Sequence, residues 1–543
     1  MCSPRVPATL LVAIFFFSSL LIAAGTKEPQ GKPDFHTSDR CVACHNQLIT
    51  PTGRDISIGI DWHSSIMANS SRDPYWQASV RRELTDHAVA KVDVEDECSL
   101  CHMPITRYEE ARVNNGKGRV FAYLPFSAHQ RDGKALQAED GVSCAVCHQI
   151  SNDGLGSRES FNGGFVVKGP DETNSRHEYG PFAIAPGHQH IMESSTGGYQ
   201  PVEAQHIRES ALCASCHQLY TTALGENGKA MGHFPEQMPY LEWLHSDFPG
   251  RYTCQQCHMT PVDEEASISS VLGVPRSGIR QHVFFGGNFF VQRMLNQYRD
   301  ELNTAALPQH LSNAAEGTLR FLHDQAARIE LENVVRTEGQ LQVDVHVVNL
   351  TGHKLPTAYP SRRAWIHLTV RDRDGHRVFE SGALNPDGSI VGNDNDADKR
   401  RYEPHYSEIT SPDQVQIYEP ILKDFKGEVT TGLLSAVGYL KDNRLLPSGF
   451  DKQTAAADIA VYGGAADDPR FVAGSHTVRY SVATGGARGP FHIQAELWYQ
   501  PIGFRWAHNL EPYQAEETQR FVRYYSSMSG SSGTVLARAE ATR

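Results

Sequence analysis

Five short stretches of this sequence share one pattern: two cysteines three positions apart, followed at once by a histidine. The five sets are Cys41/Cys44/His45, Cys98/Cys101/His102, Cys144/Cys147/His148, Cys213/Cys216/His217 and Cys254/Cys257/His258. Disulfides, zinc sites and iron–sulfur clusters also use paired cysteines, but disulfides need no histidine at a fixed offset, and zinc sites need no five identical copies. Histidine is 26 of 543 residues, so five such histidines by chance have a probability on the order of 10⁻⁷.

The pattern C-x-x-C-H is the signature of c-type haem attachment. Two thiols about one helical turn apart can each form a thioether with a haem vinyl group, and the adjacent imidazole then reaches the iron as its proximal ligand. The sequence therefore predicts five covalently bound haem c groups. The ten paired cysteines are the expected attachment residues, and the five motif histidines are the expected iron ligands. The remaining cysteine, Cys2, stands near the N-terminus.

Each iron has a second axial position, and four residues outside the motifs are candidates for it. His282 follows the last motif, between apolar residues and a glycine turn. His206 stands one or two helical turns before the fourth motif, and His353 lies in a loop shaped by glycine and proline. Met67 is a candidate through its thioether, although a methionine in a helix is ordinarily a core residue. An ordinary surface or hydrogen-bonded histidine is the alternative for each of the others.

The segment around the first three motifs resembles a known group of proteins. The stretch CVACH…DWHSSIMANSSRDPYW…CSLCHMP…DGVSCAVCHQI is similar to exported multihaem cytochromes c related to the tetrahaem electron acceptor of hydroxylamine oxidoreductase. Members carry Trp-x-x-Ser-x-His or Trp-x-x-Ser-x-Met after the first haem. Trp62, Ser65 and Met67 match the methionine form, so the resemblance implies that Met67 is a distal ligand.

Two further stretches bear on this resemblance. TGHKLPTAYPSRRAW is similar to a TGHxxPT loop in β-domains fused to such cytochromes, which implies a haem-facing role for His353. The motif pair around the Trp-x-x-Ser segment is echoed later in the chain, as CASCHQLY, LEWLHS and CQQCHMTP. There Trp243 and Ser246 match, but Phe248 occupies the ligand position, so the resemblance implies no distal ligand at that residue.

One acidic stretch suggests a different metal. Asp394, Asp396 and Asp398 alternate in GNDNDADKRRYEPHY, and Glu403 follows. Oxygen ligands at this spacing suit calcium, but Lys399 replaces the glycine of a helix–loop–helix calcium loop. A solvated acidic loop is the default interpretation, and a possible Ca²⁺ site is the alternative.

The elements that must position these residues fall into two regions. The haem motifs occupy a segment rich in glycine, proline and turns, whereas alternating or β-branched runs follow after about residue 325. The expected fold class is α+β: a mainly helical and irregular pentahaem domain with a helical linker at 26–325, then an antiparallel β-sandwich with a C-terminal helix at 326–543. Residues 1–25, with Arg5 ahead of an apolar run, have the pattern of a secretory signal peptide.

Charge and hydropathy exclude some functions. The net charge is -13 and no run of lysine or arginine stands out, so nucleic acid is not an expected partner. After the signal peptide no stretch is long and apolar enough to cross a bilayer, so the mature chain is expected to be soluble, in the periplasm or outside the cell.

Three functions are compatible with five haems. The favoured one is an electron carrier that relays electrons between redox partner proteins or to an external acceptor. The alternative is an oxidoreductase that acts on a small nitrogen or sulfur compound at one haem with an open distal site. Such reductases often replace the proximal histidine of the active haem, and no motif here does so. A docking role for the β-domain is a third, additional possibility.

Overall fold

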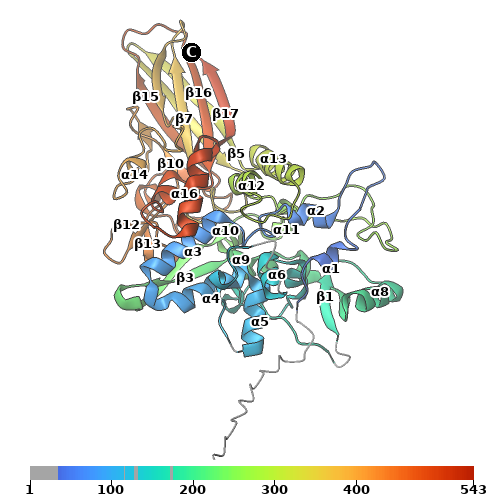
Figure 1. The fold of residues 1–543 in the computed structure, drawn as a ribbon. Helices are drawn as coiled ribbons and strands as arrows, with labels where there is room; N and C mark the ends of the chain where they lie inside the picture. Colours follow the sequence, from blue (N-terminus) through green and yellow to red (C-terminus); the bar gives the residue numbers. More distant parts are fainter. Residues whose placement is uncertain (1–34, 115, 127–132, 172–174) are drawn as a thin grey trace, which may run out of the picture. The chain divides into compact units, whose positions relative to one another are not determined.

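The computed structural model of the chain describes residues 35–543 except 115, 127–132 and 172–174 (Figure 1). The expected signal peptide therefore lies outside the described residues. Residues 34–543 form one compact unit. Within the described ranges, no helix is both long and apolar enough to span a bilayer.

Short helices make up most of the regular structure before residue 326, as glycine and proline punctuation predicts. They are α1 (Asp39–Val42), α2 (Ile58–His63), α3 (Pro74–Asp86), α4 (Lys91–His102), α5 (Pro104–Asn114), α6 (Gly133–Glu139), α7 (Cys144–Gln149), α8 (Pro186–Thr196), α9 (Ser210–His217), α10 (Pro239–Leu244), α11 (Cys254–His258), α12 (Phe289–Gln297) and α13 (Pro308–Gln325). Two small strand pairs lie among them: β1 (Arg176–Gly180) with β2 (Tyr199–Glu203), and β3 (Leu219–Leu224) with β4 (Ala230–Gln237).

Strands dominate after α13. They are β5 (Ala327–Thr337), β6 (Gln340–Asn349), β7 (Arg363–Arg371), β8 (Arg377–Ser381), β9 (Glu408–Ile409), β10 (Ile417–Tyr418), β11 (Pro420–Asp424), β12 (Val429–Thr430), β13 (Ala436–Asp442), β14 (Phe471–Val472), β15 (Ser475–Ala483), β16 (His492–Gln500) and β17 (Thr534–Thr542). One sheet has the order β10-β7-β16-β17 with β8 beside β7, and another has the order β14-β15-β6-β5 with β9 beside β15. A smaller sheet has the order β12-β11-β13. Helices and mainly antiparallel sheets together confirm the α+β prediction.

The two larger sheets share one apolar core. Alternate residues of β6, such as Val343, Val345 and Val347, are fully buried, as the two-residue period of a strand with one inward face predicts. They belong to the same cluster as Val478 of β15 and Leu497 of β16. Residues of both sheets therefore contribute to one core, and the arrangement as a β-sandwich stays a prediction.

The C-terminal end differs from the prediction. The expected helix is present as α16 (Glu516–Met528), but the chain then continues as β17, which pairs antiparallel with β16 at the edge of its sheet. The segment TVLARAEAT is rich in alanine and charged residues, which have low strand propensity, so its sequence did not point to a strand.

The two halves of the chain are in contact. Helix α16 packs on α3, where the rings of Tyr75 and Phe521 lie 5.0 Å apart and Arg81 Nε lies 2.8 Å from Glu517 Oε2. The change from helix to strand falls between Gln325 and Ala327, where the sequence predicts it. The division into domains at 26–325 and 326–543 stays a prediction.

Helix α3 begins with a side-chain cap that can be tested. Asp73 Oδ1 accepts hydrogen bonds from the backbone N–H groups of Tyr75 and Trp76, at 2.9 and 3.2 Å. Asp73→Ala is expected to lower the free energy of unfolding by about 1 kcal/mol, within a range of about 0.5–2, because two N–H groups lose their acceptor. A denaturant midpoint measures this loss. Asp73→Ser keeps a capping oxygen and is the control; equal midpoints for the two variants would contradict the capping role.

Candidate haem sites

Each of the five motifs lies on or next to a short helix. The second motif ends α4, the third opens α7, the fourth ends α9 and the fifth forms α11, while the first begins in α1 and continues into the next turn. A helical turn brings residues three and four apart onto one face, so the paired thiols and the histidine point the same way. None of these ten cysteines is paired in a disulfide, so all ten are available for thioether bonds.

Backbone carbonyls fix the rings of four motif histidines. Each ring approaches a carbonyl through Nδ1: His45 to Ile268 at 2.5 Å, His102 to Ser70 at 2.9 Å, His148 to Tyr179 at 2.6 Å, and His258 to Phe285. An Nδ1–H group that donates to a carbonyl leaves Nε2 unprotonated and free to bind a metal. Among the described contacts, His217 has no such bond.

Surrounding protein groups favour the neutral form of four motif imidazoles. Their desolvation lowers the pKa of His102 to about 4, and it lowers the pKa of His45, His148 and His258 as well. The neutral ring is the form that binds iron, so the donor set needs no proton release at neutral pH.

Two predicted distal residues face motif histidines. The rings of His148 and His282 have centres 6.4 Å apart at an interplanar angle of 24°, and those of His258 and His353 lie 6.3 Å apart at 12°. A metal–imidazole bond is about 2.0–2.1 Å long and the ring centre lies about 1.1 Å beyond, so two imidazoles on opposite sides of one metal ion have centres about 6.3 Å apart. The two measured ring separations match this value.

The other two predicted distal residues are not brought to a motif histidine ring in this way. His206 is buried, its Nε2 lies 2.8 Å from the carbonyl oxygen of Ile150, and its ring meets Tyr179 edge to face. Met67 is half-buried, and its carbonyl accepts the N–H of Val142, so its backbone lies beside the segment that precedes the third motif. Their roles as ligands stay predictions.

Thiols of different motifs lie against one another. Cys41 of the first motif is hydrogen-bonded to Cys144 of the third, and the fourth motif contacts the fifth through Cys213 and Cys254. The fourth motif also contacts the second through Cys216 and Cys101, and Cys147 of the third motif lies near Cys213 and Cys216 of the fourth. The five attachment sites therefore form one connected group with the fourth motif at its centre.

The acidic stretch after α13 does not form the oxygen cage expected for calcium. Asp396 makes two hydrogen bonds to the buried guanidinium of Arg363, and Asp394 and Asp398 pair with Arg401 and Arg400. The Glu403 carboxylate accepts backbone N–H groups of Asp394 and Val415. Each carboxylate is thus neutralised or hydrogen-bonded by the protein, and alternate spacing in sequence did not bring them to one point.

His405, Asp468 and His476 form a cluster of residue types that can bind a metal ion. The hydrogen bonds of His405, however, place its proton on Nε2. The amide nitrogens of Gln416 and Asn443 both approach His405 Nδ1, at 3.3 and 3.1 Å. These amides are oriented by other backbone bonds, so Nδ1 accepts and Nε2 carries the proton. His405 Nε2–H therefore donates to Asp468, 3.1 Å away, and is not a free metal ligand.

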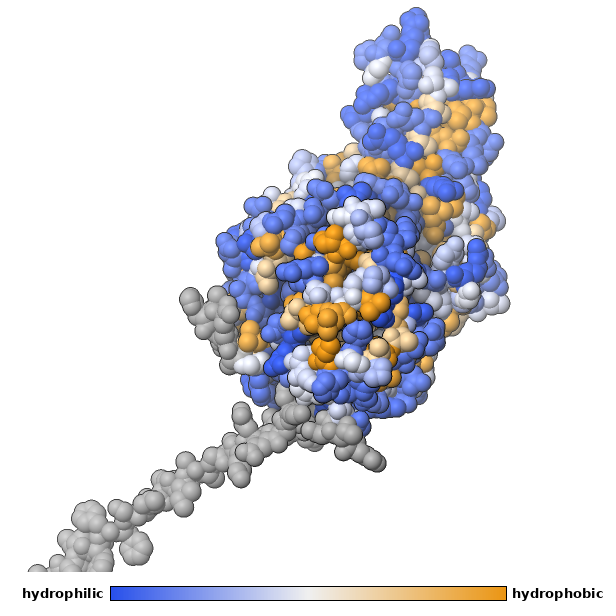
Figure 2. Space-filling view, turned by 90° about the vertical axis from the view of Figure 1, so that its right-hand side faces the viewer, coloured by the Kyte–Doolittle hydropathy of each residue, from blue (hydrophilic) through white to orange (hydrophobic). Residues whose placement is uncertain are grey.

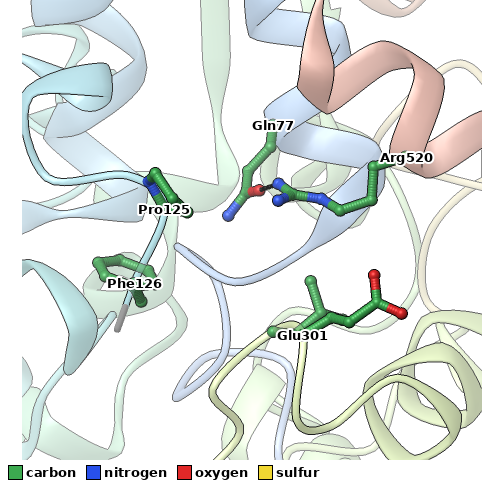
Figure 3. A pocket seen from close by; sticks show the side chains of 6 residues that line it. Gln77, Pro125, Phe126, Glu301 and Arg520 are labelled. Carbon is green, nitrogen blue, oxygen red and sulfur yellow. Dashed lines mark hydrogen bonds between the residues drawn. The ribbon is translucent and has the colours of Figure 1, made fainter. Parts of the chain in front are cut away.

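One small pocket lies apart from the motif histidines. Figure 3 shows Gln77 and Arg520 turned toward each other, with Pro125 and Phe126 opposite them and Glu301 below. Leu302 completes the lining. No motif cysteine or histidine lines this pocket, so the haem sites are defined by the motifs and their facing imidazoles.

Two contacts near the haem motifs and the His353 loop could not be predicted from the sequence. The ring of Trp76 in α3 lies parallel to that of His102, with centres 4.3 Å and planes 5° apart. Glu242 of α10 is fully buried and contacts the loop that carries His353. Both residues lie beside recognisable motifs, but their partners are distant in sequence, so only the fold identifies them.

Paired thiols followed by neutral imidazoles are the donor set that haem c requires. No family model matches the chain, and no curated protein matches it. Among solved structures, the chain is similar to the crystal structure of a penta-heme cytochrome c552 from Thermochromatium tepidum, at 15% sequence identity and a TM-score of 0.53. The match covers 94% of this chain and 100% of that chain, and it shows a shared fold.

Proposed function

We propose that this chain is a pentahaem c-type cytochrome that relays electrons between redox partners or to an external acceptor. The observation that carries the proposal is the connected group of attachment sites, in which every motif touches or adjoins another. A relay needs its centres close together, and thiols of neighbouring motifs lie against one another. Haem bound at these sites supplies one-electron chemistry.

The iron ligands follow from the same residues. His45, His102, His148, His217 and His258 are the proximal ligands in this proposal. His282 is the second ligand opposite His148, and His353 is the second ligand opposite His258, because their ring separations fit one metal ion between each pair. Met67 and His206 remain candidates for the other irons.

Export and protein partners are part of the proposal. The pattern at 1–25 supports a signal peptide, and c-type attachment motifs suit a periplasmic or extracellular protein. Figure 2 shows apolar residues gathered on one face of the molecule. Val271 and Leu272 are exposed on a loop whose Ser270 donates twice to the carbonyl of Cys44, so apolar surface borders the first motif. Such a surface supports contact with redox partner proteins.

Intact mass tests the haem count. The purified protein is expected to exceed the mass of its processed chain by five haem masses, and the excess should survive acid extraction because thioether bonds are covalent. A variant with Cys213→Ala and Cys216→Ala should retain four. A wild-type excess of four or fewer would show a vacant motif and overturn the count.

Spectroscopy separates the relay from the alternative enzyme. A carrier is expected to show each haem low-spin with both axial positions filled. A high-spin haem that binds nitrite, hydroxylamine or sulfite would instead favour an oxidoreductase with one open distal site.

A further inference from the structure

The loop that carries His353 is held by residues on the haem side of the chain. We propose that Glu242 of α10 and the segment that follows it are positioning residues, which fix His353 opposite His258. This inference rests on the proposed ligation by His353. It assigns a role to the second Trp-x-x-Ser segment. The ligand position of this segment holds Phe248, which cannot bind iron.

Glu242 ties the loop at two points. Its Oε2 accepts the backbone N–H of Lys354 at 3.1 Å and the hydroxyl of Thr357 at 2.5 Å. Lys354 immediately follows His353, so the first bond fixes the backbone next to the ligand. The carboxylate is fully buried, where an unmade hydrogen bond to a charged group costs more than at the surface.

A buried ionic group fixes Glu242 and the loop together. Arg444 Nη1 lies 3.0 Å from Glu242 Oε1, and Arg444 also makes two 2.8 Å bonds to Asp442. Lys354 Nζ lies 2.7 Å from Asp442 Oδ2 and 3.0 Å from the carbonyl of Ala460. Two carboxylates and two cations thus balance in charge, and Lys354 links the group to the ligand loop.

Gly352, the residue before His353, packs where no side chain fits. A Cβ built on Gly352 would lie 2.8 Å from Phe248 Cδ1 and 3.2 Å from Trp243 Cδ1. The aromatic residues of the second Trp-x-x-Ser segment are therefore a surface against which the loop backbone rests. A substitution here would push the loop away from α10 without touching the ligand itself.

The loop's own bonds complete the orientation of His353. Its carbonyl accepts the Asn349 amide and the Thr351 hydroxyl, both at 2.8 Å. Its Nδ1 lies 2.9 Å from the carbonyl of Lys354, so Nδ1–H donates there and Nε2 is left unprotonated. The position of Lys354, which Glu242 fixes, thus sets the direction of the imidazole.

Three variants of the full-length haem protein test the role of Glu242 and its neighbours. Glu242→Gln removes the charge, Thr357→Val removes one hydroxyl, and Gly352→Ala adds one methyl group against Phe248. In each variant, one haem in five is expected to become at least partly high-spin in the ferric state, as measured by EPR. Added imidazole is expected to return that haem to low-spin, because the vacated position is free.

The controls match each change elsewhere in the chain. Glu419→Gln alters another buried carboxylate, paired with Lys441, and Gly486→Ala adds a methyl group where nothing lies within 4 Å. Both should leave the spectrum unchanged. The positioning role would be overturned if His353→Leu alters one iron but three other variants keep wild-type spectra. These three are Glu242→Gln, Thr357→Val and Gly352→Ala. If His353→Leu alters no iron, the proposed ligation itself fails.

Discussion

In the His353→Leu variant, one haem is expected to change from low-spin to high-spin while the other four keep their spectra. Leucine fills a similar volume but offers no lone pair, and His353 faces His258 with ring centres 6.3 Å apart. Losing an imidazole donor destabilises the ferric state, so the midpoint potential of this haem should rise by on the order of 0.1 V, within the range that axial ligands span. EPR and a spectroelectrochemical titration measure the two changes.

Two companion variants make the result specific. His282→Leu should alter a different iron, the one bound by His148, so the double variant should show two altered haems. His376→Leu replaces a histidine whose side chain is 80% exposed and should change nothing. Unchanged spectra in both His353→Leu and His282→Leu would remove the two proposed distal ligands.

Asp442→Asn is expected to lower the free energy of unfolding by about 3–5 kcal/mol at neutral pH, because it leaves buried Lys354 and Arg444 short of a counter-charge. The midpoint of denaturation, followed by far-ultraviolet circular dichroism, measures the loss. Asp398→Asn breaks only an exposed pair with Arg400 and should leave the midpoint unchanged. A midpoint for Asp442→Asn equal to wild type would show that the buried ionic group contributes no stability.

The difference in stability between wild type and Asp442→Asn is expected to depend on pH. Burial alone would raise the pKa of Asp442, but Arg444 and Lys354 hold it well below its usual range. A carboxyl whose pKa is lower in the folded state stabilises the fold above its unfolded pKa of about 3.9, and that contribution is lost as the pH falls through the folded value. The stability difference between wild type and Asp442→Asn should therefore be constant above about pH 5 and shrink below pH 4.

The attachment motifs could be predicted because their chemistry is local. Two thiols and an imidazole within five residues need only one helical turn, so the sequence alone identifies Cys41 to His258 as the attachment region. The alternation of β6 and β16 was equally local. By contrast β17 is a strand because β16 offers it an edge, and its own residues favour other structures.

The order of the residues in the sequence does not reveal which distal histidine lies near which motif histidine. His282 follows the fifth motif, yet its ring faces His148 of the third, and the fifth motif's His258 is faced by His353 from the other half of the chain. For the acidic stretch, a solvated loop was the default interpretation and calcium the alternative. The pairing of Asp396 with Arg363, which lies on a strand distant in sequence, could not be predicted from the alternating aspartates.

The contact order of the motifs has a consequence for maturation of the chain. The fourth motif touches the second as well as the fifth, and the first touches the third, so two of these three contacts join motifs that are not consecutive in the chain. His353 comes from the loop after β6, long after the last attachment site has been made. If His353 is the second ligand opposite His258, a chain with haem attached at every motif would still lack this imidazole until β5 and β6 have folded.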